Sequence, residues 1–151
     1  MIWSSKEKGV RQVARILLIE DNNDIQEILY SLLSEDHEVL QAFSGTEGLR
    51  LFQQESVDLV LLDIMLPGKN GDQVLEEIRL QSQVPVIMMT ALGDKHLISQ
   101  YLLAGANDYI VKPFNLDEVA ARVTVQLRNH VSPAQEAQAS QKLSFKNLVL
   151  N

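Results

Sequence analysis

Short apolar runs alternate with longer amphipathic stretches along most of the sequence, and this alternation restricts the fold more than any other feature. Each run has the length of a strand and is rich in branched residues, whereas the stretches between the runs repeat their apolar residues at helical spacing. Five such units are too few for a closed eight-stranded barrel, which needs about 250 residues. The pattern therefore predicts an α/β fold with an open, doubly wound parallel sheet of five strands. The predicted strands comprise residues 15–19, 38–43, 59–63, 84–90 and 108–111.

The predicted helices carry apolar faces that we expect to pack on this sheet. Asn22 or Asn23 supplies the N-cap of the first helix, and Ser44 and Gly45 open the second. Gly105 is suited to end the fourth helix, and Arg122 is expected to point outward from the last one. The inward residues predicted for the first, fourth and last helices are Ile25, Ile28, Leu29, Leu32 and Leu33; Leu97, Ile98, Tyr101 and Leu102; and Leu116, Val119, Ala120, Val123 and Leu127.

The segments outside the alternation predict tails and a second domain. Residues 1–14 are polar and aperiodic, which predicts a leader or tail before a single domain at 15–129. Residues 130–142 are rich in Ser, Gln and Ala and predict a linker. Residues 143–151 alternate like a strand, so we expect them to begin a second, truncated domain. The alternative is an ordered tail that pairs with an edge of the existing sheet.

Composition excludes several classes of function. The net charge of -7 and the scattered positions of the 13 Lys and Arg residues argue against nucleic-acid binding by these residues. The absence of cysteine excludes disulfides, thiolate metal ligands and thiol nucleophiles. We find neither the apolar core of a signal peptide nor a run of about 20 apolar residues, so we expect a cytoplasmic protein without a membrane partner.

Acidic residues follow two of the predicted strands. Asp63 ends the most apolar run and is followed by the turn residues Pro67 and Gly68. Glu20 and Asp21 follow the first run directly. Because parallel strands end at one edge of a sheet, we expect the three carboxylates to crowd one pocket, which is unfavourable without a compensating cation. Mg²⁺ prefers such oxygen ligands, so the sequence predicts a magnesium site.

Two further strand ends complete a site for phosphoryl transfer. Thr90 ends the fourth strand and offers a hydroxyl, and Lys112 follows the fifth and offers a compact positive charge. Asp63 is then the candidate nucleophile, because an aspartyl carboxylate can form an acyl phosphate. Each residue alone has an ordinary structural explanation, such as a cap, a loop acid or a solvated charge. Their joint placement at strand ends favours the chemical interpretation.

These motifs resemble the receiver domain of two-component response regulators. The resemblance covers residues 15–129 in the order typical of that family, and it implies a flavodoxin-like (βα)5 fold with strand order 2-1-3-4-5. The residues that carry it are 19–22 (IEDN), 63–71 (DIMLPGKNG), 89–91 (MTA) and 105–114 (GANDYIVKPF).

The resemblance implies a role for each residue of the site. Asp63 is expected to accept a phosphoryl group from a sensor histidine kinase, and Lys112 to contact that group. Glu20, Asp21, Asp63 and the backbone carbonyl of Met65 are expected to hold Mg²⁺. Such a protein is not an enzyme in the usual sense, because it catalyses only its own phosphorylation and dephosphorylation.

The resemblance also implies a switch and a cis peptide bond. Thr90 and Tyr109 are the expected switch pair, in which the hydroxyl moves toward the phosphoryl group and the ring turns inward. The Lys112–Pro113 bond is expected to be cis. Met65 and Leu92 flank the site in this family and tune dephosphorylation. Because both are apolar, neither can orient a water, and we predict a phosphoryl lifetime longer than seconds.

The last helix and the segment after it resemble the OmpR/PhoB subfamily, in which a similar segment begins a winged-helix DNA-binding domain. Such proteins regulate transcription, and DNA would be bound only through that missing domain. Their receivers dimerise on phosphorylation through charged pairs that Asp108, Glu118 and Arg122 could supply. Two positions depart from the subfamily: Ile98 replaces a basic residue, which removes a partner of Glu118, and Asn107 replaces a frequent Asp.

Three other classes of protein are less consistent with the sequence. A phosphatase of the haloacid dehalogenase type needs two spaced aspartates after its first strand, whereas this chain has Glu20 and Asp21 adjacent. A flavin-binding flavodoxin needs a phosphate-binding loop there, and residues 20–24 are too acidic for one. A receiver-like module that works without phosphorylation remains an alternative, which only a phosphorylation assay excludes.

Overall fold

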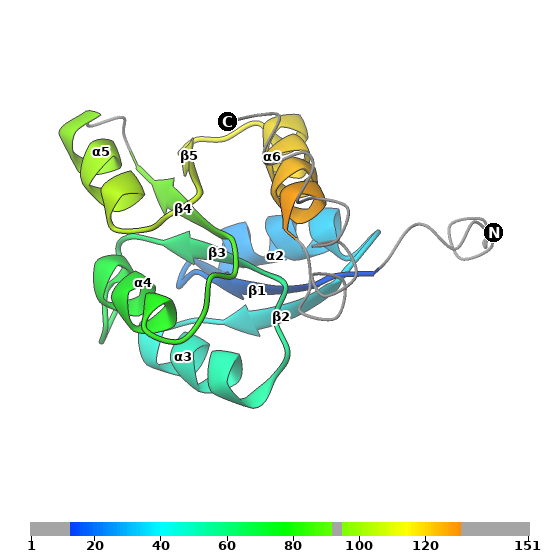
Figure 1. The fold of residues 1–151 in the computed structure, drawn as a ribbon. Coiled ribbons are helices and arrows are strands. Elements are labelled where there is room, and N and C mark those ends of the chain that lie inside the picture. Colours follow the sequence, from blue (N-terminus) through cyan, green and yellow to red (C-terminus); the bar gives the residue numbers. More distant parts are fainter. Residues whose placement is uncertain (1–12, 92–94, 131–151) are drawn as a thin grey trace, which may run out of the picture.

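The computed structural model describes residues 13–91 and 95–130. They form one parallel sheet with strand order β2-β1-β3-β4-β5 and helices on both of its faces (Figure 1), which confirms the predicted fold class. Residues 1–12 and 131–151, and so most of the predicted leader, linker and second domain, lie outside the described residues. The elements are β1 Arg15–Ile19, α2 Asn23–Leu33, β2 Glu38–Ala42, α3 Gly45–Gln54, β3 Leu59–Asp63, α4 Gly71–Arg79, β4 Val86–Thr90, α5 Lys95–Leu103, β5 Asp108–Val111 and α6 Leu116–Asn129.

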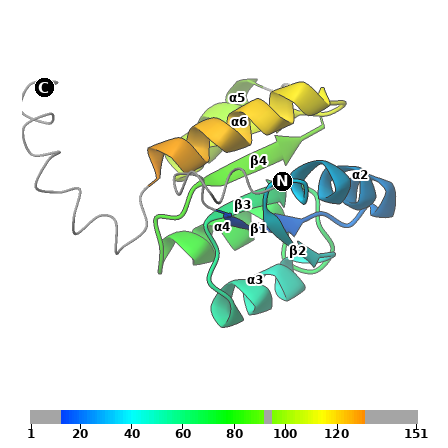
Figure 2. The same ribbon diagram turned by 90° about the vertical axis from the view of Figure 1, so that its right-hand side faces the viewer.

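Successive residues of the central strands enter opposite layers of the core. In β1, Leu17 packs beneath α3 and α4, whereas Leu18 packs beneath α2 and α6. In β3, Val60 and Leu61 alternate in the same way. Figure 2 shows the two helical layers, with α3 and α4 below the sheet and α2 and α6 above it. Strands covered on both faces read as continuous apolar runs, which is why β1, β3 and β4 were recognisable in the sequence.

Side-chain caps begin four of the helices. Asn22, Ser44, Asn70 and Asn115 each accept hydrogen bonds from backbone amides of the first turn of α2, α3, α4 and α6, respectively. At α4 the cap is reciprocal, because the Gln73 side chain accepts a hydrogen bond from the Asn70 amide. Such caps stabilise a helix by about 1 kcal/mol each, so local sequence determines where these helices start.

Some of the predicted inward faces differ from the observed ones. Ile28 of α2 and Leu116 of α6 are exposed, and the polar Gln26 is buried in the α2 face instead. Helix α5 buries none of its nine residues, although Tyr101 packs partly against the core. Gly105 follows α5 with a φ of 114°, as its predicted role as a helix terminator requires.

Within the described part of the chain, we find no helix with the length and apolar character that a membrane span needs.

Candidate functional site

Four of the predicted site residues lie at the carboxyl edge of the sheet. Glu20 follows β1, Asp63 ends β3, Thr90 ends β4 and Lys112 follows β5. Glu20, Asp63 and Thr90 are buried, with 1%, 4% and 7% of their surfaces exposed. The strand order places β1 beside β3, so the winding reverses where the acids meet, which is where open parallel sheets bind ligands.

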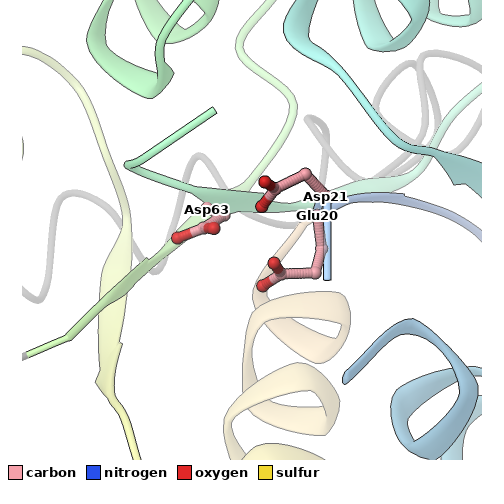
Figure 3. Close-up of side chains that lie close together, drawn as sticks. All are labelled: Glu20, Asp21 and Asp63. Atoms are coloured by element: carbon pink, nitrogen blue, oxygen red, sulfur yellow. The ribbon is translucent and has the colours of Figure 1, made fainter. Parts of the chain in front are cut away.

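Three carboxylates come together at this point. One oxygen each of Glu20, Asp21 and Asp63 lies within 4.8 Å of the others, and Asp21 alone of the three is exposed (Figure 3). Two of the three acids are buried, whereas the exposed Asp21 leaves the pocket open to solvent. A set made only of carboxylate oxygens, with one side open for water, fits a hard divalent cation such as Mg²⁺.

Lys112 supplies the positive charge of the site. Its Nζ lies 2.9 Å from Glu20 Oε1 and 3.3 Å from Asp63 Oδ1, and its side chain is only 20% exposed. Its backbone amide donates a 2.7 Å hydrogen bond to the carbonyl of Thr90, which holds the start of the following loop against β4. One ammonium group therefore faces two of the three carboxylates, Glu20 and Asp63, and the pocket keeps an excess of negative charge that favours a cation.

Burial and charged neighbours have opposing effects on the pKa values of Glu20 and Lys112, and both pKa values are raised. Burial raises the pKa of the Glu20 carboxyl, against the hydrogen bonds that it accepts from Lys112 and from the Asn22 amide. Burial lowers the pKa of the Lys112 ammonium, but the hydrogen bond to Glu20 and the charge of Asp63 outweigh that effect, so the pKa is raised. Lys112 consequently stays protonated at neutral pH and can bind phosphoryl oxygens.

The loop after β3 folds back tightly on Asp63. The Gly71 amide donates a 2.8 Å hydrogen bond to the carbonyl of Ile64, which closes the loop. A Cβ at position 71 would lie 2.6 Å from the carbonyl oxygen of Asp63 and 2.7 Å from Ile64 Cα, so no side chain fits without a backbone shift. The start of α4 therefore fixes the segment that carries Asp63. In the same loop, the side chain of Met65 is 74% exposed.

The residues predicted for dimer contacts pair with one another within this chain. The Arg122 guanidinium donates hydrogen bonds of 2.9 Å to both carboxylate oxygens of Asp108 and one of 3.1 Å to Glu118. It also lies 5.9 Å from the ring centroid of Tyr109, which packs partly against the core. The prediction that Arg122 points outward is therefore only partly correct, because its guanidinium bonds to Asp108 of β5.

Three other sequence predictions concern the same region. The Lys112–Pro113 bond is cis, as predicted. Leu92 lies outside the described residues. Asn107, one of the two departures from the subfamily, has a structural role: its Oδ1 accepts hydrogen bonds from the Val86 amide and from Arg79.

Sequence reasoning missed two polar residues that organise the sheet. Gln26 is buried and donates a hydrogen bond to the backbone carbonyl of Glu20, and Arg79 joins the end of α4 to the turn between α5 and β5. A signal for Gln26 existed, because it shares helical spacing with the buried Leu29 and Leu33. For Arg79 we find none, since its carbonyl partner Gly105 is 26 residues away.

The fold and the site together define a class of protein: doubly wound domains that gather acids, a hydroxyl and a lysine at one sheet edge. A comparison with family models matches residues 16–124 to the response regulator receiver domain. The chain therefore belongs to the family of response regulator receiver domains.

Solved structures agree with this assignment. The chain is similar to a two-component response regulator from Clostridium difficile, with 29% identity and a TM-score of 0.75 over 80% of this chain and 100% of that one. It is similar to the receiver domain of NtrX from Brucella abortus, with 32% identity and a TM-score of 0.72 over 76% and 99%. A CheY-like receiver domain protein from Methanospirillum hungatei shares 30% identity, with a TM-score of 0.73 over 84% and 99%.

Proposed function

We propose that this protein is a phosphorylation-dependent signalling switch in which Asp63 accepts a phosphoryl group from a sensor histidine kinase. The observation that carries the proposal is the setting of Asp63. Its carboxylate ends a buried strand, faces Lys112 at 3.3 Å and shares a pocket with Glu20 and Asp21. A nucleophile, a cationic group and a candidate metal site thus meet at one point, as phosphoryl transfer requires.

In the proposed reaction, an Asp63 oxygen forms a bond to phosphorus as the phosphorus–nitrogen bond of a phosphohistidine breaks. The imidazole leaves with the electron pair of that bond and takes a proton from solvent. Lys112 binds phosphoryl oxygens, and Glu20, Asp21, Asp63 and the Met65 backbone carbonyl would hold Mg²⁺. Bound Mg²⁺ supplies positive charge where the transferring group is negative. In this proposal the protein catalyses only its own phosphorylation and dephosphorylation and is not an enzyme in the usual sense.

Acetyl phosphate with Mg²⁺ tests this proposal, with intact mass as the measurement. We expect an increment of one phosphoryl group that depends on Mg²⁺ and disappears in Asp63→Asn. Asp72→Asn is the matched control, because Asp72 is an exposed acid on α4 and should leave the increment unchanged. A folded wild type that takes no phosphoryl group from acetyl phosphate or from a kinase would instead favour a module that works without phosphorylation.

We propose that Thr90 and Tyr109 transmit phosphorylation. Both lie at the β4–β5 side of the sheet, and their strands are hydrogen-bonded neighbours.

The apolar Met65 and Leu92 leave no side chain at these positions to orient an attacking water, so the phosphoryl group should persist for longer than seconds. Following the decay of the intact-mass increment after removal of acetyl phosphate tests this lifetime, and rapid loss contradicts it.

The proposed output of the switch is a homodimer formed through α5, β5 and α6. The support is charge and exposure: Asp108, Glu118 and Arg122 form an ion-pair network on β5 and α6, and Leu102 and Leu103 of α5 are exposed. Sedimentation with and without acetyl phosphate should show a phosphorylation-dependent dimer, which Arg122→Ala weakens without preventing phosphoryl uptake.

We further propose a cytoplasmic transcription regulator of the OmpR/PhoB type. Its support is the alternating sequence of residues 143–151, which lies outside the described residues. The negative charge of this chain agrees with DNA contact through a separate winged-helix domain. Binding of DNA by the protein together with that domain, strengthened by phosphorylation, is the expected result of a gel-shift assay.

A further inference from the structure

One buried polar side chain lies beside the site but belongs to none of the roles above. Among the described residues, the buried polar or charged side chains are Glu20, Gln26, Asp63 and Thr90, and Gln26 is 1% exposed. It comes from the first half of α2, a helix otherwise buried through Leu29 and Leu33. Burying an amide is costly unless its hydrogen bonds are satisfied, so its partners explain its position.

The Gln26 side chain contacts three backbone carbonyls. Its Nε2 lies 3.2 Å from the oxygen of Leu18, 3.0 Å from that of Glu20 and 2.8 Å from that of Ala42. Its Oε1 accepts a 2.9 Å hydrogen bond from the Gln41 side chain. Three carbonyl acceptors around one atom require the NH₂ group there, so the orientation of the amide is determined by its surroundings.

These carbonyls belong to the ends of β1 and β2, where the acidic pair begins. Glu20 lies one residue beyond β1, and its own amide donates a 3.0 Å hydrogen bond to the carbonyl of Ala42. Gln26 bonds both to the carbonyl of Ala42, the last residue of β2, and to the carbonyl of Glu20, the first residue after β1. These hydrogen bonds fix the backbone of Glu20, and this backbone determines the direction of the Glu20 and Asp21 side chains.

We propose that Gln26 is a positioning residue for Glu20 and Asp21, and that it sets the affinity of the acidic pocket for a divalent cation. The inference rests on the proposed function, in which this pocket holds Mg²⁺. Groups that orient metal ligands through hydrogen bonds commonly change metal affinity by about 10- to 100-fold when they are removed. Because Gln26 acts on the backbone of Glu20 and not on its carboxylate, we expect the lower end of that range.

Calorimetric titration of the full chain with MgCl₂ tests the inference. Gln26→Met keeps the volume of the side chain and removes its donors, and we expect the Kd for Mg²⁺ to rise about tenfold. The matched control is Gln41→Met, which removes the partner of Oε1, leaves the three carbonyl contacts in place and should leave the Kd unchanged. Gln26→Asn keeps an amide that is too short to span the carbonyls. It provides the decisive variant if Gln26→Met does not fold, and its Kd should also rise.

Phosphoryl uptake from acetyl phosphate supplies a second readout. For a positioning role, Gln26→Met should need more Mg²⁺ for half-maximal rate, and saturating Mg²⁺ should restore most of the wild-type rate. A purely structural role would leave the Kd of the folded variants at the wild-type value, and that result overturns the inference while the wild type still binds Mg²⁺ and is phosphorylated. A wild type that binds no Mg²⁺ overturns both this inference and the proposed metal site.

Discussion

Helices α4 and α5 are consecutive crossovers of nine residues each, and they are attached to the sheet in opposite ways. Helix α4 begins at a reciprocal cap and buries Gly71, Val74, Leu75 and Ile78. Helix α5 buries none of its residues and leaves Leu103 87% exposed. Two helices of the same length therefore bury different amounts of apolar surface, and we expect α4 to contribute more to the free energy of unfolding than α5.

The difference separates a fixed side of the site from an adjustable one. Helix α4 holds the loop that follows Asp63, because Gly71 packs directly on the backbone of Asp63 and Ile64. Helix α5 packs on the core only partly, through Tyr101, and just beyond its end Arg79 donates a hydrogen bond to the carbonyl of Gly105. Moving α5 disturbs little buried surface, so we expect a signal at the site to change α5 and leave α4 in place.

The largest expected effect comes from the buried face of α4. Ile78 is fully buried, and Ile78→Ala should lower the free energy of unfolding by about 2–5 kcal/mol because it leaves a cavity in the core. Urea denaturation followed by circular dichroism measures this loss. A change below about 1 kcal/mol would mean that α4 is not the anchored helix.

A smaller effect is expected at the junction between the two helices. Arg79 donates hydrogen bonds to Gly105, Asn107 and Ser82, and Arg79→Met leaves these acceptors without that donor. We expect a loss of about 1–3 kcal/mol in unfolding free energy. Hydrogen exchange should also become faster in the turn between α5 and β5. Arg50→Met is the control, because Arg50 is an exposed residue of α3, and it should be near neutral.

Phosphorylation itself should distinguish the helices. With acetyl phosphate and Mg²⁺, we expect amide exchange in α5 to change by about tenfold, which corresponds to about 1.4 kcal/mol of local opening free energy. Exchange in α4 should stay the same, and Asp63→Asn should abolish the response. An equal change in both helices would refute the division into a fixed and an adjustable side.

The smallest expected effect on stability belongs to the exposed face of α5. Leu103→Ala removes little buried surface and should change the free energy of unfolding by less than about 0.5 kcal/mol. The same variant should weaken the proposed phosphorylated dimer in sedimentation experiments. A large loss of stability would show that Leu103 packs on the core.

Most of the fold was predictable because the signals are local. The buried strands read as apolar runs, and the caps Asn22 and Ser44 mark helix starts. The placement of Glu20 and Asp63 at one edge follows from parallel strands alone. By contrast, the inward face predicted for α2 was partly wrong, since Ile28 is exposed and a glutamine is buried.

What required the tertiary structure are the contacts between segments distant in the chain. Helical spacing could place Gln26 on the buried face of α2, but no local pattern reports that three carbonyls at the ends of β1 and β2 converge on its amide. Arg122 likewise turns toward Asp108, which is 14 residues earlier. Local spacing of residue types sets elements, caps and the candidate nucleophile, since these depend on neighbours along the chain. How deeply a helix is buried, and which polar group a carbonyl meets, depend on distances that exist only once the sheet has assembled.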